Sequence, residues 1–282
     1  MKKILFLILS LLAGSVQAQQ KVNSLLWKIS REGMPDSYLF GTMHAMCKED
    51  YQEPEKLAEL FAQCSQLILE TDLSDTKSFG EMMLVVELKE DTTLRWYIPN
   101  DDDYLEIKSG CEANGIELDE YMRFKPMLLI SMLSMKNFSC TDVESFEANL
   151  MKMAQRDKKS IFGLESALYQ LQLFDQLSRE DILEMIKSAL QELSNKDQHD
   201  QMTTLYKNRD VEGLYDLISR SSEMKDHRDL FLHQRNKNWV NQLPDILKEV
   251  PSFIAVGAGH LGGPQGVIAL LRAKGFKVEP VL

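Results

Sequence analysis

The stretch Leu39-Phe40-Gly41-Thr42-Met43-His44 has a counterpart near the other end of the chain, Ala255-Val256-Gly257-Ala258-Gly259-His260. In both stretches an apolar, strand-like run is followed by Gly-x-x-His. Glycine lacks the Cβ that disfavours positive φ, and we expect it to permit a sharp exit from each strand. Each histidine then lies in the loop at the carboxyl end of its strand, where open α/β sheets place their sites. The pair therefore predicts a sheet whose functional edge is built from both ends of the chain.

Two carboxylates occupy equivalent places. Glu70 ends the apolar run Leu67-Ile68-Leu69, and Glu165 ends Ile161-Phe162-Gly163-Leu164. If all four runs are parallel strands of one sheet, two imidazoles and two carboxylates meet at one edge. Such a set suits a divalent transition metal, and a carboxylate that is not a ligand can serve as general base for water. The alternative is that the histidines are hydrogen-bonded structural residues and the glutamates mark the solvent edge of the sheet.

The rest of the chain alternates short apolar runs with helical spacing. The runs 25–29 and 38–40 flank a turn-rich segment and predict a hairpin, with further strands at 252–256 and 276–281. Apolar residues at three-to-four spacing predict helices at 54–63, 101–113, 126–137, 145–156 and 265–274. A long charged stretch, 178–243, is helical in pattern with breaks near Asn208 and Ser221, and we interpret it as a helical insertion or cap. The alternation predicts an α/β or α+β sheet protein.

The first 18 residues have the pattern of a signal peptide. Lys2 and Lys3 precede an apolar run, and Val16-Gln17-Ala18 is a small-x-small cleavage site. The run is too short to span a bilayer, and Ser15 stands where a lipoprotein would need cysteine. We expect cleavage after Ala18 and an exported, periplasmic or extracellular domain over 19–282; the alternative is a hydrophobic N-terminal helix of a cytosolic protein. Removal of the two lysines takes the formal charge from −11 to −13, which argues against nucleic acid as a partner.

The four cysteines are an even set, which suggests disulfides in an oxidising compartment. The pairing we predict is Cys47–Cys64 with Cys111–Cys140; the alternative is that the cysteines are free and buried. No Cys-x-x-Cys occurs, so neither a zinc ribbon nor a thioredoxin-type site is supported.

A dinucleotide site is the rival interpretation of the second glycine-rich turn. Gly257-Ala258-Gly259-His260-Leu261-Gly262 matches G-x-G-x-x-G between a predicted strand and a predicted helix. A mononucleotide-binding half also needs a further strand-helix-strand, and none follows before Leu282. We therefore expect no nucleotide cofactor.

Arg235 lies shortly before the second motif. An arginine near a hydrolytic site can stabilise the negative charge that develops on an oxyanion. The alternative is a surface arginine on an exposed helix.

Taken together, these residues resemble the TraB/GumN family (TraB/PrgY/GumN), which includes the Tiki proteases. The matching segments follow the family's order and span nearly the whole chain after residue 24: Leu25-Leu26-Trp27-Lys28-Ile29, Tyr38 to His44, Leu69-Glu70-Thr71-Asp72, Lys125-Pro126, Phe162-Gly163-Leu164-Glu165-Ser166, Arg235-Asn236 and Val256 to Gly263. The resemblance implies a central mixed sheet with two pseudo-repeated halves, flanked and capped by helices in an EreA/ChaN-like arrangement.

The resemblance also implies a function. It places His44, His260, Glu70, Glu165 and Arg235 in one cleft and implies a metalloprotease that uses a divalent metal, with Mn²⁺ or Co²⁺ typical and Zn²⁺ possible. On this basis we expect the two histidines and Glu165 to bind the metal, Glu70 to activate water and Arg235 to stabilise the oxyanion; the roles of the two glutamates can be exchanged. The expected partner is a peptide or protein substrate.

Two other functions stay open. One is a protein that binds a peptide or other ligand in the same cleft, and so sequesters a signal, without turnover. The other is a hydrolase that works without a metal.

Overall fold

The computed structural model describes residues 22–72, 74–195, 197–221 and 224–282. The predicted signal peptide and its cleavage site lie outside these residues. In the described part of the chain, no helix combines the length and apolar character needed to cross a bilayer.

A six-stranded mixed sheet forms the centre of the fold, with strand order β6-β4-β7-β2-β1-β8. The predicted hairpin is confirmed, because β1 and β2 pair antiparallel with Trp27 opposite Leu39. Strands β2, β7, β4 and β6 all run parallel to one another, while β8 pairs antiparallel with β1. The strands of this sheet are β1 Leu26–Ser30, β2 Ser37–Thr42, β4 Gln66–Leu69, β6 Ser160–Gly163, β7 Ser252–Gly257 and β8 Lys277–Pro280.

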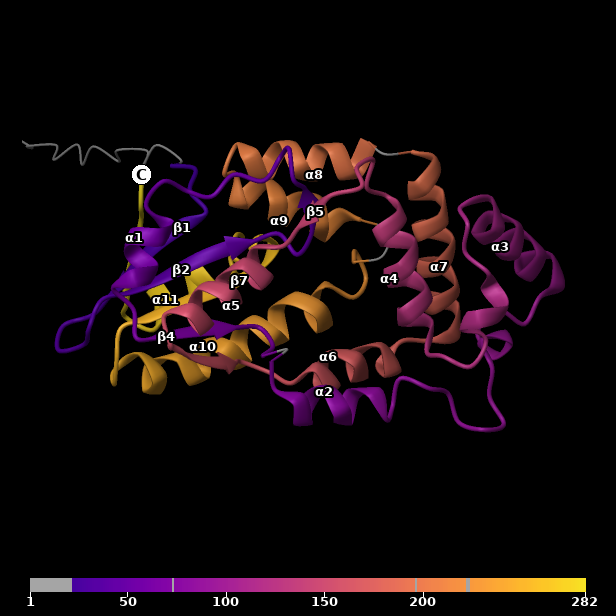
Figure 1. Cartoon of the computed structure of the whole chain (residues 1–282), viewed down its shortest axis with the longest axis horizontal. Coiled ribbons are helices and arrows are strands. Elements are labelled where there is room, and N and C mark those ends of the chain that lie inside the picture. The colour runs from indigo at the N-terminus through magenta and orange to yellow at the C-terminus, as the bar shows by residue number, and fades with distance from the viewer. Residues whose placement is uncertain (1–21, 73, 196, 222–223) are drawn as a thin grey trace, which may run out of the picture.

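The central strands are continuous apolar runs because helices cover both faces of a parallel sheet. Every residue of β2 and β4 is buried, as are the first five residues of β7. The apolar run that ends at Glu165 also forms a strand, β6, as predicted. This strand lies at the edge of the sheet and is mostly exposed, and Phe162 is 49% exposed. The helices that pack around this sheet are α1 Leu57–Ala62, α5 Phe146–Arg156, α10 Gln234–Leu247 and α11 Val267–Ala273 (Figure 1).

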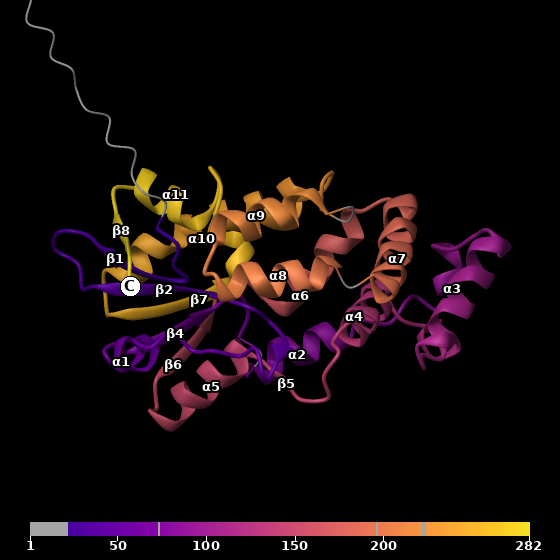
Figure 2. The ribbon, with the colours of Figure 1, turned by 90° about the horizontal axis from the view of Figure 1, so that it is seen from above.

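A second group of helices stands away from the sheet. Figures 1 and 2 both show α3, α4 and α7 at the end of the molecule opposite to β1 and β8. These helices enclose a hydrophobic cluster of their own, separate from the one around the sheet, with Ile107, Leu133 and Ile186 fully buried in it. Their bounds are α3 Asp101–Ala113, α4 Pro126–Lys136 and α7 Arg179–Ser194.

Between the two groups lie α2 Thr76–Met83, α6 Ala167–Leu173, α8 Asp197–Lys207 and α9 Val211–Arg220 (Figure 1). The breaks predicted near Asn208 and Ser221 are present, since α8 ends at Lys207 and α9 at Arg220. A further break at Asn195 separates α7 from α8, and a π-helical turn, Asp229–His233, leads into α10. The predicted helical stretch also continues beyond Leu243 to Leu247.

The predicted cysteine pairing is wrong, because the disulfide joins Cys47 to Cys140. A short second sheet explains the pairing: β3 Met46–Cys47 runs antiparallel to β5 Val143–Glu144 and brings the two cysteines together. Cys64 is buried in the core around the sheet and Cys111 in the helical cluster, so both stay free. The prediction paired each cysteine with the next one along the sequence. The fold instead joins cysteines from two segments 93 residues apart.

Loss of this disulfide should lower the free energy of unfolding by about 2–5 kcal/mol, because the bridge closes a long loop in the unfolded chain. Its two cysteines are 93 residues apart. The measurement is urea unfolding of the wild type and of Cys47→Ser, each with and without reductant. We expect reductant to lower the wild-type midpoint and to leave the variant unchanged. Equal wild-type midpoints in both conditions would contradict this role.

Candidate functional site

The four predicted strand-end residues all lie at one edge of the sheet. Because β2, β4, β6 and β7 are parallel, their carboxyl ends meet there. Gly41 pairs with Val256 and Thr42 with Gly257, so the two Gly-x-x-His segments lie side by side. The sequence-based expectation that both ends of the chain form one edge is therefore met by the fold.

The glycines of the two motifs provide close approach rather than an unusual backbone conformation. Gly257 has φ −51°, and a Cβ added to Gly41 would lie 3.1 Å from Cα of Ala258. The expectation of a positive φ at these glycines is therefore wrong. Within the described residues, the glycines with positive φ are Gly33, Gly115, Gly263 and Gly275. Gly41 lies close to Leu261 and to the Ala258 backbone, whereas the atoms nearest to the Cβ position of Gly257 are side-chain atoms of Glu70, His260 and His44.

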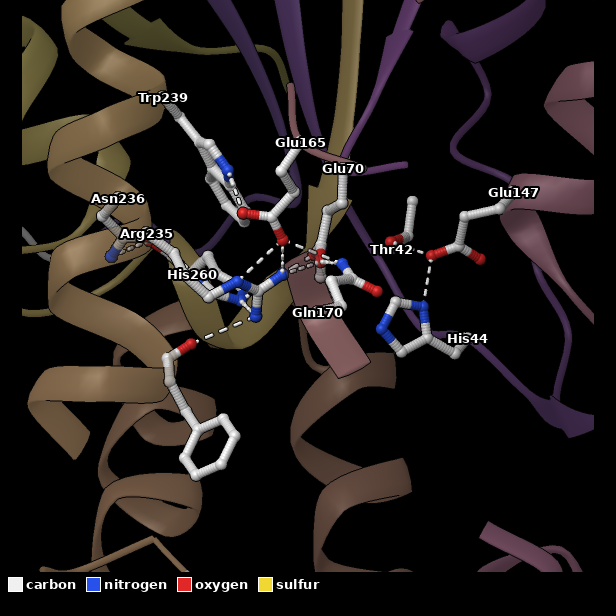
Figure 3. A network of polar contacts seen from close by, with 12 residues as sticks. Thr42, His44, Glu70, Glu147, Glu165, Gln170, Arg235, Asn236, Trp239 and His260 are labelled. Atoms are coloured by element: carbon white, nitrogen blue, oxygen red, sulfur yellow. Dashed lines mark hydrogen bonds and ion pairs between the residues drawn. The ribbon is translucent and has the colours of Figure 1, made fainter. Parts of the chain in front are cut away.

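Arg235 is buried at this edge and binds both glutamates. Its Nη2 donates to Glu70 Oε2 at 2.6 Å and to Glu165 Oε1 at 2.5 Å, and its Nε donates to Glu165 Oε1 at 2.8 Å (Figure 3). Its Nη1 lies 3.1 Å from the Phe231 carbonyl oxygen and 3.2 Å from His260 Nε2. The alternative of a surface arginine is excluded, because only 10% of the side chain is exposed.

Both oxygens of the Glu165 carboxylate accept hydrogen bonds. Besides Arg235, its Oε1 accepts from Gln170 Nε2 at 2.9 Å, and its Oε2 accepts from the indole Nε1 of Trp239 at 2.9 Å. The guanidinium of Arg235 in turn lies over the Trp239 ring, 4.9 Å from its centroid. Glu165 is therefore part of a rigid, closed network.

Glu70 keeps one oxygen closer to the histidines. Its Oε2 accepts from Arg235 and from Gln170 Nε2, whereas its Oε1 accepts from the Gly257 N–H at 2.7 Å and lies 3.8 Å from His260 Nε2. Burial opposes ionisation of Glu70, but the neighbouring His260, Arg235 and His44 and the Gly257 N–H lower its pKa to about 2. Glu70 is an ionised carboxylate with Oε1 on the histidine side.

His260 is buried and held in one orientation. Its Nδ1 lies 2.7 Å from Asn236 Oδ1, and Asn236 Nδ2 donates to the Gln265 carbonyl at 2.8 Å, which fixes the amide so that Nδ1 is the donor. The ring packs on Trp239 with 4.5 Å between centroids. Burial lowers the pKa of His260 to about 3, so the ring is neutral with its lone pair on Nε2.

His44 differs from His260 in its exposure. Its side chain is 71% exposed, and its Nδ1 lies 2.7 Å from Glu147 Oε1. The hydrogen bond to Glu147 raises the pKa of His44 to about 9. In Figure 3 the ring stands across from the Arg235 network, with Glu70 between them.

The two histidines and Glu70 converge beside Gly257. A Cβ placed on Gly257 would lie 3.2 Å from Glu70 Oε1, 3.7 Å from His260 Cδ2 and 3.8 Å from His44 Nε2. These are the three atoms nearest to that position. The missing side chain of Gly257 thus leaves a small space that three of the five predicted residues border.

The side chains at this edge are not arranged as a metal-binding site. Among the described residues, no group of three or more His, Cys, Asp or Glu side chains could hold an ion in its present arrangement. The cation that contacts Glu70, Glu165 and His260 here is the guanidinium of Arg235.

Four residues of this network were given no site role from the sequence, namely Glu147, Gln170, Asn236 and Trp239, although Asn236 belongs to the segment Arg235-Asn236 that carries the resemblance. Asn236 and Trp239 follow Arg235 by one and four positions on α10, so helical spacing alone would have placed Trp239 near it. Glu147 lies in the helix predicted at 145–156, and nothing in that pattern indicates a contact with His44. No motif or spacing in the sequence points to Gln170.

Comparison with known proteins supports the relationship suggested by the motifs. The model of the TraB/PrgY/gumN family matches residues 25–280. Metalloprotease TIKI1 of Danio rerio is 22% identical over 93% of this chain and 64% of its own length, and the human TIKI1 is 22% identical over 93% and 62%. The metalloprotease TIKI homologue of Nematostella vectensis is 20% identical over 93% of this chain and 68% of its own.

The chain spans slightly less than two thirds of the length of the two TIKI1 proteins. No solved structure matches. The family model covers both Gly-x-x-His motifs and all five predicted site residues, and the chain therefore belongs to the TraB/PrgY/gumN family.

Proposed function

We propose that this protein is an exported, metal-dependent hydrolase of peptide bonds, with His44, His260 and Glu70 holding a divalent transition metal. The convergence of these three side chains on the space beside Gly257 is the observation that carries the proposal. The names of the relatives, which are metalloproteases, support a peptide bond as the target. The predicted signal peptide and the disulfide support export.

The donor types present suit such a metal, and their side chains would have to shift from the arrangement described above to hold it. Both rings have Nδ1 at an acceptor oxygen, of Glu147 for His44 and of Asn236 for His260. This arrangement directs Nε2 of each ring toward the site, as is usual for histidines that bind metals. Nε2 of His260 accepts from Arg235 Nη1 at 3.2 Å, so a metal would have to replace that contact. Two imidazoles and a carboxylate suit manganese, cobalt or zinc, and the resemblance favours Mn²⁺ or Co²⁺.

Glu70 is a better candidate for the metal ligand than Glu165, which was expected from the sequence to have that role. The oxygens of Glu165 accept from Arg235, Gln170 and Trp239, and neither oxygen is among the atoms nearest to the Gly257 Cβ position. Glu70 Oε1 accepts one hydrogen bond, from Gly257, and is the carboxylate oxygen nearest to the space between the histidines. Glu165 instead fixes Arg235.

Arg235 has a supporting role in this proposal. Its guanidinium uses Nε, Nη1 and Nη2 on Glu70, Glu165, His260 and the Phe231 carbonyl. With these donors engaged, Arg235 holds the two carboxylates in place, and stabilisation of an oxyanion by it would require one of these bonds to open.

If His44, His260 and Glu70 hold a metal, it would supply Lewis-acid chemistry toward a peptide carbonyl and would help to activate water. The chain's own residues set the direction of approach. His44 is exposed, whereas Glu70, Glu165, Arg235 and His260 are at most 10% exposed, so the substrate approaches from the side of His44. The buried side excludes bulk water and keeps the ionic contacts strong.

A hydrolase without metal is the second candidate. The exposed His44 ring, hydrogen-bonded through Nδ1 to Glu147, is also the arrangement of an acid–base group oriented by a carboxylate. With its pKa raised to about 9, the ring would serve as a general acid near neutral pH and as a general base only above that pH. Full activity in the presence of a chelator would favour this candidate. Stoichiometric capture of a peptide with no cleavage product would instead favour a binding protein without turnover.

Replacement of either histidine should abolish tight metal binding. We expect His44→Ala and His260→Ala to weaken Co²⁺ binding by about 100-fold or more, because losing a ligand should cost at least as much as the roughly 10–100-fold typical for losing a residue that only orients one. Isothermal titration and metal analysis of protein purified without chelator measure this. The matched control is His227→Ala, because His227 pairs with Asp181 at 3.3 Å and belongs to another part of the molecule. Unchanged affinity in both site variants would remove the metal assignment.

Gly257→Ala tests the space beside the three residues. The backbone at φ −51° and ψ 133° accepts alanine, so we expect the protein to fold. The added methyl group enters the space bordered by Glu70, His260 and His44, and Co²⁺ affinity should fall about tenfold or more, in line with losses seen on disturbing metal surroundings.

Gly80→Ala is the control for this substitution. Gly80 lies in α2, and nothing stands within 4 Å of its added Cβ. Its affinity for Co²⁺ should equal that of the wild type. A Gly257→Ala variant that also binds Co²⁺ like the wild type would show that the metal does not occupy this space.

A further inference from the structure

We infer that Glu147 is a positioning residue that fixes the His44 ring and directs its Nε2 into the site. The inference rests on the proposed function, because it concerns a ligand of the proposed metal. It starts from a difference between the two histidines. His260 is buried, packs on Trp239 and is held by Asn236, whereas 71% of the His44 side chain is exposed.

Within the described residues, Glu147 is the only hydrogen-bond partner of the His44 ring. Its Oε1 lies 2.7 Å from Nδ1. An exposed side chain without such a contact would populate several rotamers. The orientation that brings Nε2 to 3.8 Å from the Cβ position of Gly257 therefore depends on this hydrogen bond.

Glu147 is itself fixed from two directions. Thr42, the last residue of β2, donates its hydroxyl to the same Oε1 at 2.6 Å, and Ser145 donates to Oε2 at 3.1 Å. Glu147 also lies in the first turn of α5, for which Ser145 is the N-cap, and a carboxylate is favoured at that end of a helix dipole. Its side chain is 18% exposed.

The helix that carries Glu147 is anchored in the core. Phe146 is 1% exposed, and its ring contacts Phe40 of β2 at 5.3 Å and Tyr51 at 4.3 Å between centroids. Strand β2, its following loop and α5 therefore form one rigid unit. Glu147 bridges the strand end to the histidine two residues further on.

The loop that carries His44 is also held on its far side. Cys47 is linked to Cys140, and β3 pairs with β5 through Met46 and Glu144. The segment 140–147 thus contacts this loop before and after His44, at Thr42 through Glu147 and at Cys47 through the disulfide. Glu147 is the member of this segment that touches the imidazole.

A carboxylate on Nδ1 has two effects on a metal-binding histidine. It selects the tautomer with the lone pair on Nε2, and it raises the basicity of that nitrogen. Loss of such a partner typically weakens metal binding by about 10–100-fold. Glutamine can still accept from Nδ1 but lacks the charge, whereas alanine offers no acceptor.

The experiment compares Glu147→Ala and Glu147→Gln with the wild-type full chain. We expect Co²⁺ affinity, measured by isothermal titration, to fall about 10–100-fold in Glu147→Ala and by less in Glu147→Gln. The visible spectrum of bound Co²⁺ should change in Glu147→Ala, because the His44 nitrogen is no longer fixed. The control is Glu144→Gln, since Glu144 lies in the same segment and accepts from Asn149 at 3.1 Å, away from the imidazole.

Two readouts separate this inference from simple misfolding and from the proposed function. Urea unfolding shows whether the variants are folded, and a purely structural role would lower stability without a change in the Co²⁺ spectrum of the remaining folded protein. The ¹⁵N shifts of the His44 ring in metal-free protein, recorded at a pH above its pKa of about 9 so that the ring is neutral, report its tautomer directly. We expect Nδ1–H in the wild type and a mixture with Nε2–H in Glu147→Ala.

The outcomes are distinguishable. A wild-type protein that binds no Co²⁺ overturns the proposed function, and the tautomer measurement then decides the role of Glu147 alone. Wild-type Co²⁺ binding, with affinity, spectrum and tautomer all unchanged in Glu147→Ala, overturns the present inference and leaves the proposed function intact.

Discussion

The parallel pairing of β2 with β7 is the constraint on which the rest of the molecule depends. It joins segments more than 200 residues apart, since Ser37 at the start of β2 already bonds to Ser252, 215 residues later. Because the strands are in register from Tyr38 opposite Phe253 to Thr42 opposite Gly257, their two loops begin at the same level. One residue of slippage would turn every side chain to the other face and would separate the two imidazoles.

The buried contact of Arg235 with two glutamates is the second constraint, and it joins α10 to the sheet. Glu70 and Glu165 lie at the ends of adjacent strands β4 and β6, where two unpaired negative charges would oppose burial. The arginine neutralises both and, with Trp239, fixes how α10 lies on the edge. Removal of one partner of a buried ion pair typically costs about 3–5 kcal/mol, so this network gives the site rigidity as well as charge.

The sequence predicted the parts of this arrangement that have local signals. Apolar runs such as Leu67-Ile68-Leu69 gave the buried strands, and the spacing around Ser145 gave the start of α5. It did not reveal the Cys47–Cys140 bridge, which depends on the pairing of two-residue strands, or Glu147, which reaches His44 only once α5 has packed beside β2. The sequence also did not reveal why the motifs contain glycine, because the close approach of two distant segments cannot be inferred from a local sequence pattern.

The pairing of β1 with β8 has a consequence for how the chain can be rearranged. Ser24 donates to the Val281 carbonyl at 2.9 Å, and the Val281 N–H donates to Leu26 at 2.8 Å, so the first and last described segments are hydrogen-bonded neighbours (Figure 2). Domains with adjacent ends tolerate circular permutation. The exposed turn between β1 and β2, with Gly33 at its tip, is a natural place for new ends. A permuted chain of this kind would run directly from β8 into β1 and would carry the His44 segment close to its new N-terminus.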